Sequence, residues 1–149
     1  MRRKPDPPHR VLIAGGGVAG LAAAKALRRV RVTVTLVLAE IKGVDLDART
    51  ITCGEGLETS YDTLILAGGA RAPREVEPDL TLPGRPEVFV LGETAAPHAT
   101  TQQARHVART IRRRLRWDIH PRPFRYRAVR FRTSHGSLRA RPYNHVILP

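Results

Sequence analysis

The chain has 149 residues, enough to bury a hydrophobic core in one domain but short for a two-domain enzyme. Hydrophobic residues make up 42% of the sequence, which argues against wholesale disorder. Its 26 lysines and arginines outnumber 13 acidic residues and give a formal net charge of +13. We therefore expect association with anions such as phosphate-bearing cofactors, acidic lipids or nucleic acid.

The first predicted elements form a strand–helix–strand unit. Residues 11–14 (VLIA) are an apolar run closed by glycines, which is typical of a buried parallel strand. Residues 18–29 are rich in alanine and predict a helix with three apolar side chains on one side: Leu21, Ala24 and Leu27. Residues 30–38 (VRVTVTLVL) are β-branched and alternating, which predicts a second strand. We expect the crossover between the two strands to be right-handed.

The middle of the chain predicts short strands and turns. Residues 41–60 indicate a meander with turns near 47–49 and 54–56. Residues 63–67 (TLILA) predict another buried strand that ends in glycines. A proline-rich connection over residues 74–86 follows.

The last third predicts one strand and one long helix. Residues 87–93 (EVFVLGE) form a strand that runs into a glycine and an acid. Residues 101–116 predict a helix with arginines on one face and an apolar face of Ala104, Val107, Ala108, Ile111 and Leu115. Residues 124–132 alternate aromatic residues and arginine, as one more strand would, before any period is lost. The chain thus divides into an N-terminal tail (1–9), a domain (10–127) and a basic C-terminal tail (128–149).

Three glycines between the first strand and the helix match the G-x-G-x-x-G dinucleotide fingerprint: Gly15, Gly17 and Gly20. Gly15 would permit the tight turn, Gly17 the close approach of a pyrophosphate, and Gly20 close helix–strand packing. The helix N-terminus would direct N–H groups and a partial positive charge at the phosphates. The strand–turn–helix context favours phosphate binding over a purely structural turn.

The fingerprint also calls for an acid near the end of the second strand, to bind the ribose. Leu38 stands at the most natural position, and Glu40 is the first available carboxylate. Glu40 is two residues further on, so it would face the same side of a continuous strand. Ribose binding by Glu40 and an ordinary exposed glutamate stay as alternatives.

Two later motifs, YDTLILAGGA (61–70) and PEVFVLGETA (86–95), carry a family resemblance together with the fingerprint. The chain resembles the FAD-binding part of type II NADH dehydrogenases, NADH:quinone oxidoreductases of the pyridine nucleotide-disulfide oxidoreductase superfamily. That family has a strand ending in Ala-Thr-Gly against the FAD, and here Gly68 stands in place of the threonine. A later strand ends in Gly-Asp, whose acid holds the ribityl chain, and here Glu93 stands in place of the aspartate.

The resemblance extends to the helix that follows and then stops. Gln102 and Gln103 match a glutamine pair that the family places near the flavin and the quinone. Three family features are missing: a helical insertion after the second strand, the whole NADH-binding domain expected between Pro73 and Glu77, and a recognisable membrane-anchoring C-terminal region.

The elements and the resemblance together indicate an α/β, Rossmann-like FAD-binding domain, shortened, with a mainly parallel sheet and a small β-meander. FAD is the implied cofactor, and NADH enters only as an electron donor. The residues expected to bind FAD are Gly15, Gly16, Gly17, Val18, Ala19, Gly20, Glu40, Ala67, Gly68, Gly69, Gly92, Glu93, Gln102 and Gln103.

The cysteine and the histidines predict no redox or metal centre. The single cysteine, Cys53, excludes an intramolecular disulfide and is expected to be a small buried residue. The six histidines form no metal-ligand spacing with it, so we expect no metal. We nominate no catalytic side chain, because in such enzymes the flavin does the chemistry.

Three functions remain open: an FAD-dependent oxidoreductase of the NADH dehydrogenase-like kind, completed by a partner chain or by a second copy; a truncated FAD-binding relic without catalysis; and a basic module that binds nucleic acid or a membrane surface. Arginine is spread over the whole chain, which favours a solvated face over a nucleic-acid site. No secretion signal or bilayer-spanning run is present, so we expect a cytoplasmic protein. The resemblance adds quinone as a partner and a peripheral place at the inner face of the cell membrane.

Overall fold

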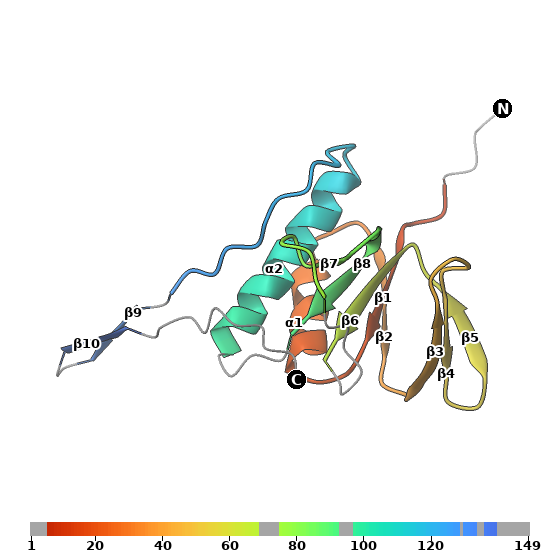
Figure 1. Cartoon of the computed structure of the whole chain (residues 1–149), viewed down its shortest axis with the longest axis horizontal. Helices are drawn as coiled ribbons and strands as arrows, with labels where there is room; N and C mark the ends of the chain where they lie inside the picture. The colour runs from red at the N-terminus through yellow and green to blue at the C-terminus, as the bar shows by residue number, and fades with distance from the viewer. Residues whose placement is uncertain (1–5, 69–74, 93–96, 129, 134–135, 140–149) are drawn as a thin grey trace.

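The computed structural model describes residues 6–68, 75–92, 97–128, 130–133 and 136–139. Three layers lie side by side in it: two helices, a mainly parallel sheet and a small antiparallel meander (Figure 1). The predicted α/β, Rossmann-like class with a parallel sheet and a β-meander is therefore confirmed.

The central sheet has the strand order β2-β1-β6-β8-β7. All neighbouring strands are parallel except β7, which pairs antiparallel with β8. The sheet is formed by β1 (Arg10–Ala14), β2 (Thr33–Val37), β6 (Thr63–Ala67), β7 (Thr81–Leu82) and β8 (Arg85–Leu91). Among the described residues β2 pairs only with β1, so β2 is an open edge.

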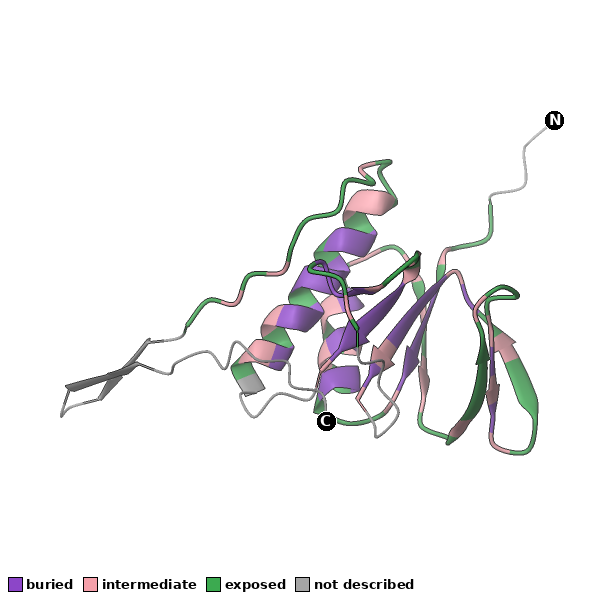
Figure 2. Ribbon diagram, viewed as in Figure 1, coloured by how far each residue is buried: buried purple, intermediate pink, exposed green. Residues whose placement is uncertain are grey.

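The inner strands are apolar throughout because both of their faces are covered. In β1, Val11 and Ile13 belong to the core under the helices, whereas Leu12 and Ala14 belong to the core under the meander. The burial colours of Figure 2 follow the same division, with buried residues concentrated in the inner strands and the facing sides of the helices. Alternation along one strand therefore feeds two separate cores.

Helix α1 (Val18–Leu27) buries an i, i+4 stripe of small and apolar residues: Ala19, Gly20, Ala23 and Leu27. Leu21, predicted to share a face with Leu27, is 57% exposed instead. The prediction was wrong because the stripe facing the sheet and the second helix begins at Ala19, and residue 21 is turned away from it.

Helix α2 (Pro97–Arg114) begins four residues before the predicted start and packs against α1. Proline suits a first helical position, since its missing N–H would have no partner there. The predicted apolar face is buried at Ala104, Val107, Ala108 and Ile111, but Leu115 follows the helix and is 39% exposed.

The meander consists of β3 (Ile41–Asp45), β4 (Thr50–Cys53) and β5 (Leu57–Ser60), paired in the order β3-β4-β5. Both predicted turns are present, and in the first one Asp45 Oδ1 accepts hydrogen bonds from the N–H groups of Asp47 and Ala48. Cys53 is buried in the core under this layer, as predicted.

Two features differ from what the sequence predicted. The strand expected over residues 124–132 begins only at Arg130, and residues 124–128 have no regular structure. The short strand β7 lies within the predicted proline-rich connection. The segment 118–128, here called the strap, runs beside α2 without regular structure and is held by a hydrogen bond from Phe124 N to Pro78 O at 2.8 Å. Beyond it, β9 (Arg130–Thr133) and β10 (Gly136–Arg139) form a separate antiparallel hairpin.

Candidate cofactor-binding site

The candidate site lies where the strand order of the sheet reverses. From β1 the chain crosses through α1 to β2 on one side, whereas β6 is followed by β8 on the other side. In open α/β sheets the crevice at such a switch point, beyond the carboxyl ends of the strands, is where ligands bind. Gly15, Gly16 and Gly17 follow β1, and Gly68 follows β6, so both predicted glycine segments meet at this edge.

Two positions of the fingerprint accept no side chain. Gly15 has φ +122°, and a Cβ built on it would overlap the carbonyl oxygen of Ala67. A Cβ built on Gly20 would overlap the carbonyl oxygen of Gly15. Gly15 therefore closes the turn against β6, and Gly20 lets α1 pack directly on the loop, as the fingerprint predicted.

The N-terminus of α1 is open to a ligand. Gly17 is the N-cap and no side chain caps the helix, and the first turn contains no acidic residue. Gly16, Gly17 and Val18 are exposed, while Ala19 is buried. The first N–H groups of a helix have no intrahelical acceptor and carry a partial positive charge, so this loop suits a phosphate.

The ribose side of the loop differs from the expectation. Strand β2 ends at Val37, so Glu40 lies outside it and the alternation argument for its direction does not apply. Glu40 is exposed, and its backbone oxygen accepts a hydrogen bond from Gly54 N at 3.0 Å. The side chain of Leu38 instead reaches the loop, since a Cβ on Gly16 would overlap Leu38 Cδ2.

The residues expected near the flavin lie at the carboxyl ends of β6 and β8 and at the start of α2. Ala67 is buried and Gly92, which follows β8, is half-buried. Gly69 and Glu93 lie outside the described residues. Gln103 is buried, and its Oε1 has no hydrogen-bond partner among the described residues.

Gln102 has a partner that sequence patterns did not reveal. Its Nε2 donates to Arg127 O at 2.7 Å, and its Oε1 accepts from Arg127 N at 2.8 Å. The two bonds fasten the strap to the second turn of α2. No local pattern indicates a pairing between residues this far apart in the sequence.

The buried side of α2 carries a neutralised histidine. His106 is buried and meets the ring of Phe124 edge-on, with centroids 5.7 Å apart. Burial lowers the pKa of His106, a hydrogen bond to the backbone of Asp79 opposes this, and the charge of Arg109 lowers the pKa further. His106 is therefore uncharged at neutral pH and serves to dock the strap.

Two surface hollows lie away from the glycine loop, and neither contains a predicted FAD-binding residue in its lining. One, of about 650 Å³, lies between β7 and the strap. The other, of about 680 Å³, lies between α1 and α2 and is lined by cationic side chains. Arginine is spread along the whole sequence, so the sequence did not predict that these side chains line one hollow.

Among the residues that the structure describes, no three His, Cys, Asp or Glu side chains group in a way that could hold a metal ion. No helix in the same part of the chain is both long and apolar enough to cross a membrane.

No protein-family model matches the chain, and no curated protein matches it either. Among solved structures, the chain is similar to the sulfide:quinone oxidoreductase from the hyperthermophilic bacterium Aquifex aeolicus, with 18% identity over 74% of this chain and a TM-score of 0.37. The match covers 33% of that protein, so the chain spans about a third of its length. A likeness at this level establishes neither activity nor ligand, and the class of the chain follows from its own sheet: a Rossmann-like α/β domain.

Proposed function

We propose that this chain binds FAD at the carboxyl ends of β1 and β6 and serves as the flavin-binding part of an oxidoreductase similar to type II NADH dehydrogenases. The observation that carries the proposal is the glycine loop at the switch point, where Gly15 and Gly20 accept no Cβ and α1 presents an uncapped N-terminus. A glycine loop with exposed backbone N–H groups and no side chains in the way lets a pyrophosphate approach closely.

Each part of the cofactor has a candidate partner. The loop from Gly15 to Gly20 would take the pyrophosphate, and Glu40 the adenosine ribose. The ribityl chain would lie near Gly92 and Glu93. The ring system would lie beside Ala67, Gly68 and Gly69 and the Gln102–Gln103 turn, where Gln103 Oε1 is a buried acceptor in need of a donor.

The role of the chain itself would be to bind FAD and to orient it. The N–H groups of the first turn of α1 would donate to the phosphates without any change in protein charge. The exposed side chain of Leu38 would move aside from Gly16, which costs little because it is the end of a flexible side chain. FAD, when bound, supplies the hydride and electron transfer, so no side chain is assigned a catalytic step.

Electron supply would depend on something beyond the described residues. These contain one parallel sheet with one glycine loop between a strand and a helix, and a separate fold for NADH is not among them. We therefore propose that a partner chain or a second copy presents the donor, with a quinone as acceptor at the membrane surface.

The test starts from the absorption spectrum of the purified chain after incubation with FAD, followed by addition of NADH. Two glycine variants of equal charge then locate the site. Gly16→Asp places a carboxylate in the loop, where only Leu38 Cδ2 must move, and we expect it to weaken FAD binding by about tenfold or more. Gly43→Asp is the matched control, because nothing lies within 4 Å of a Cβ built there.

The outcomes separate the alternatives. Flavin binding that Gly16→Asp removes and Gly43→Asp preserves supports the site. A bound flavin that NADH bleaches supports dehydrogenase activity in this chain, and one that NADH leaves oxidised supports a binding module that needs its partner. A colourless chain that takes up no FAD overturns the proposal.

A further inference from the structure

The groove between α1 and α2 gathers positive charge from two distant parts of the sequence. It has a volume of about 680 Å³ and a floor of small residues that includes Ala22, Ala26 and Ala108. Its cationic lining comes from the end of α1 and the two residues after it and from the middle of α2: Lys25, Arg28, Arg29, Arg105, Arg109 and Arg112.

These six cations (the groove cations below) have no ion pair and no side-chain hydrogen bond among the described residues. Other arginines of the same molecule are paired. Arg113 meets Asp118 at 3.5 Å, Arg122 meets Asp118 at 3.2 Å, and Arg10 meets Asp62 at 3.1 Å. The fold thus places acidic residues beside arginines elsewhere and none in the groove.

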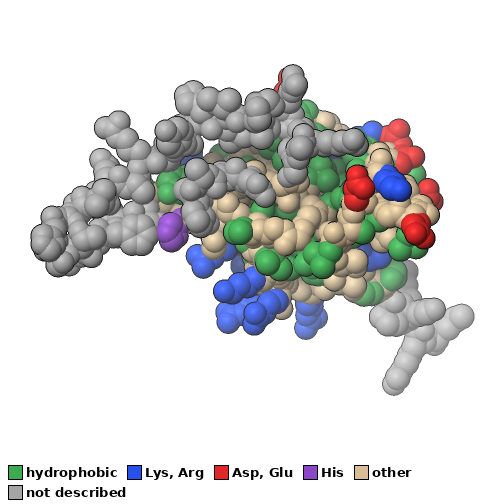
Figure 3. All heavy atoms as spheres, turned by 90° about the horizontal axis from the view of Figure 1, so that it is seen from below, with side chains coloured by type: hydrophobic (Ala, Val, Ile, Leu, Met, Phe, Trp, Pro, Cys, Tyr) green, Lys and Arg blue, Asp and Glu red, His purple; other side chains and the backbone are tan. Residues whose placement is uncertain are grey.

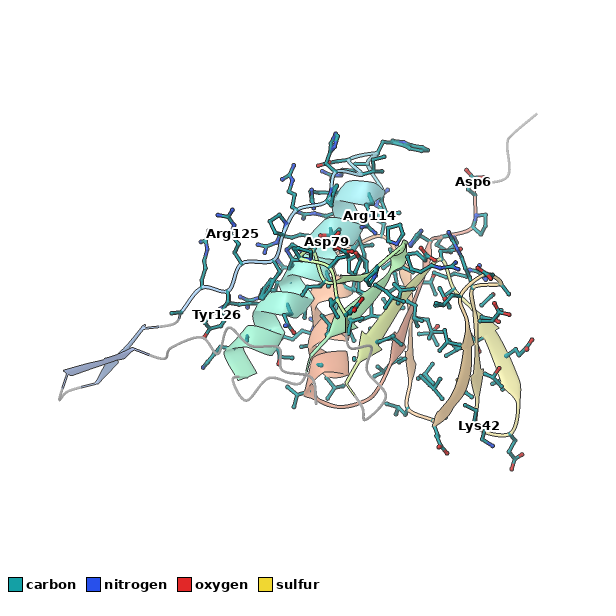
Figure 4. The ribbon with its side chains drawn as sticks, in the orientation of Figure 1. Asp6, Lys42, Asp79, Arg114, Arg125 and Tyr126 are labelled. Atoms are coloured by element: carbon teal, nitrogen blue, oxygen red, sulfur yellow. The ribbon has the colours of Figure 1, made fainter. Side chains whose placement is uncertain are left out.

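Arg114 lies on α2 two residues beyond Arg112, the last groove residue, and shows the contrast. It lies 3.9 Å from Asp79, donates to the backbone oxygen of Pro86, and stacks over the Phe89 ring at 5.0 Å from the centroid. Figure 4 shows Arg114 and Asp79 near each other at the end of α2. Arg114 is therefore a structural residue, whereas the side chains of the groove cations can bind a ligand from outside the described fold.

Acidic and basic residues are divided between the helices and the meander. Neither α1 nor α2 contains an acidic residue, whereas the meander carries four: Asp45, Asp47, Glu55 and Glu58. Figure 3 shows Lys and Arg side chains gathered on one part of the surface and most Asp and Glu side chains on another. Like charges on facing helices repel, so a bound anion would stabilise this arrangement.

The spacing of the cations suits an extended row of phosphates. Arg105, Arg109 and Arg112 follow one face of α2 and span about 10 Å at 1.5 Å per residue. Phosphates of a nucleic-acid strand recur about every 3.4 Å along a duplex axis, so the row matches about three of them. One guanidinium group can donate two parallel hydrogen bonds to one phosphate, and this bidentate geometry favours arginine at such sites.

The shape of the groove narrows the choice of polyanion. A flat bilayer would touch only the rims of a concave groove, whereas one sugar–phosphate strand of a duplex protrudes far enough to enter it. The lining contains no aromatic side chain, so bases find no stacking platform there. We infer that the α1–α2 groove binds the sugar–phosphate backbone of nucleic acid, without preference for base sequence.

This site is independent of the proposed FAD site. The glycine loop lies at the N-terminus of α1, and the groove lining begins one turn further along the same helix, at Ala22. The helix has 10 residues and is about 15 Å long, so both sites can be filled at once. Loss of one leaves the other testable.

The experiment measures binding of the full chain to a fluorescently labelled DNA duplex of scrambled sequence over a series of salt concentrations. The test variant is Arg105→Gln with Arg109→Gln. The matched control is Lys42→Gln with Arg125→Gln, which removes the same charge from β3 and from the strap, both labelled in Figure 4 and both outside the groove. Circular dichroism checks that each variant is folded.

We expect the groove variant to lose on the order of tenfold in affinity and the control less than about twofold, and the slope of log affinity against log salt to fall by about 1.8 in the groove variant alone. Equal losses in the two variants would mean diffuse attraction to a basic protein and would overturn the inference. An unchanged DNA affinity in the groove variant would also overturn it. So would tighter binding to anionic-lipid vesicles or to polyglutamate than to DNA, if the groove variant loses that tighter binding.

Discussion

Helix α1 has a candidate anion site at each end; one consists of backbone groups and the other of charged side chains. At its N-terminus the glycine loop contains no charged side chain and presents only backbone N–H groups. At its C-terminal end the groove presents three cations from α1 and the residues after it, and three more from α2. The first site depends on close packing, and the second depends on summed charge.

The difference predicts opposite responses to change. A backbone site tolerates no added methyl group, because its geometry is set by contacts that leave no space. A charged groove tolerates any one substitution, because each cation contributes a small share and salt screens all of them. The glycine loop should therefore be more sensitive to sterics and less sensitive to salt than the groove.

The largest effect is expected from Gly20→Ala. The new Cβ would overlap the carbonyl oxygen of Gly15, and neither backbone segment can move without opening the loop. We expect a loss of about 3 kcal/mol in unfolding free energy, measured by urea denaturation. Alanine is the better helix former by about 1 kcal/mol, so a stabilised variant would show that the loop is not packed as described.

Gly43→Ala is the matched control for this substitution. A Cβ at Gly43 meets nothing within 4 Å, so the change in unfolding free energy should stay within about 0.5 kcal/mol.

A smaller effect is expected from Leu38→Asp. Leu38 is 75% exposed and its side chain lies over Gly16, where the fingerprint would favour an acid for the ribose. We expect FAD to bind about threefold more tightly, because a carboxylate there can accept from a ribose hydroxyl. The measurement is a fluorescence titration with FAD.

Leu57→Asp on β5 serves as the control for Leu38→Asp, since Leu57 is 71% exposed and belongs to the meander. Equal FAD affinities in the two variants would place the ribose elsewhere, and weaker binding by Leu38→Asp alone would mean that the new charge repels the phosphates.

The smallest effect is expected on stability at acidic pH. Burial lowers the pKa of His106, so the folded chain binds fewer protons than the unfolded chain below the ordinary pKa of 6.5. Stability is then complete above that pH and falls as the pH decreases. His9, where burial also lowers the pKa, acts in the same direction.

Thermal unfolding measured from neutral pH downward should show this fall, and His106→Phe should make it shallower while keeping the ring contact with Phe124. A melting temperature that rises below about pH 6.5 would contradict the sign of the effect.

Features of local origin could be predicted from the sequence. The apolar runs of β1, β6 and β8, the glycine turn and the amphipathic face of α2 each follow from the order of neighbouring residues. The glycines could be assigned roles because Gly15 and Gly20 act through short-range sterics. The same reasoning missed the exposure of Leu21, which depends on where α2 packs. It also treated the second strand as continuing to Glu40, because nothing in TLVLAE marks Val37 as its end; ribose binding by Glu40 stays a prediction.

Features that join distant segments could not be predicted. Gln102 is fastened to Arg127 through its backbone, and any residue at position 127 other than proline offers the same groups. The groove cations lie on two helices and in the two residues after α1, and the helices approach because both pack on one face of the sheet. Counting arginines along the sequence therefore favoured a solvated face, whereas the binding surface that we infer depends on their arrangement in space.

The open edge at β2 has a practical consequence for handling the protein. The strand TVTLV contains no charge, no proline and no bulge, the devices that usually keep edge strands apart. Mutual repulsion between chains of net charge +13 is the remaining protection. The screening length shrinks from about 10 Å at 0.1 M salt to about 3 Å at 1 M. A high-salt wash that strips nucleic acid from the purified chain should therefore also invite edge-to-edge aggregation, and stocks should keep best when concentrated at low ionic strength.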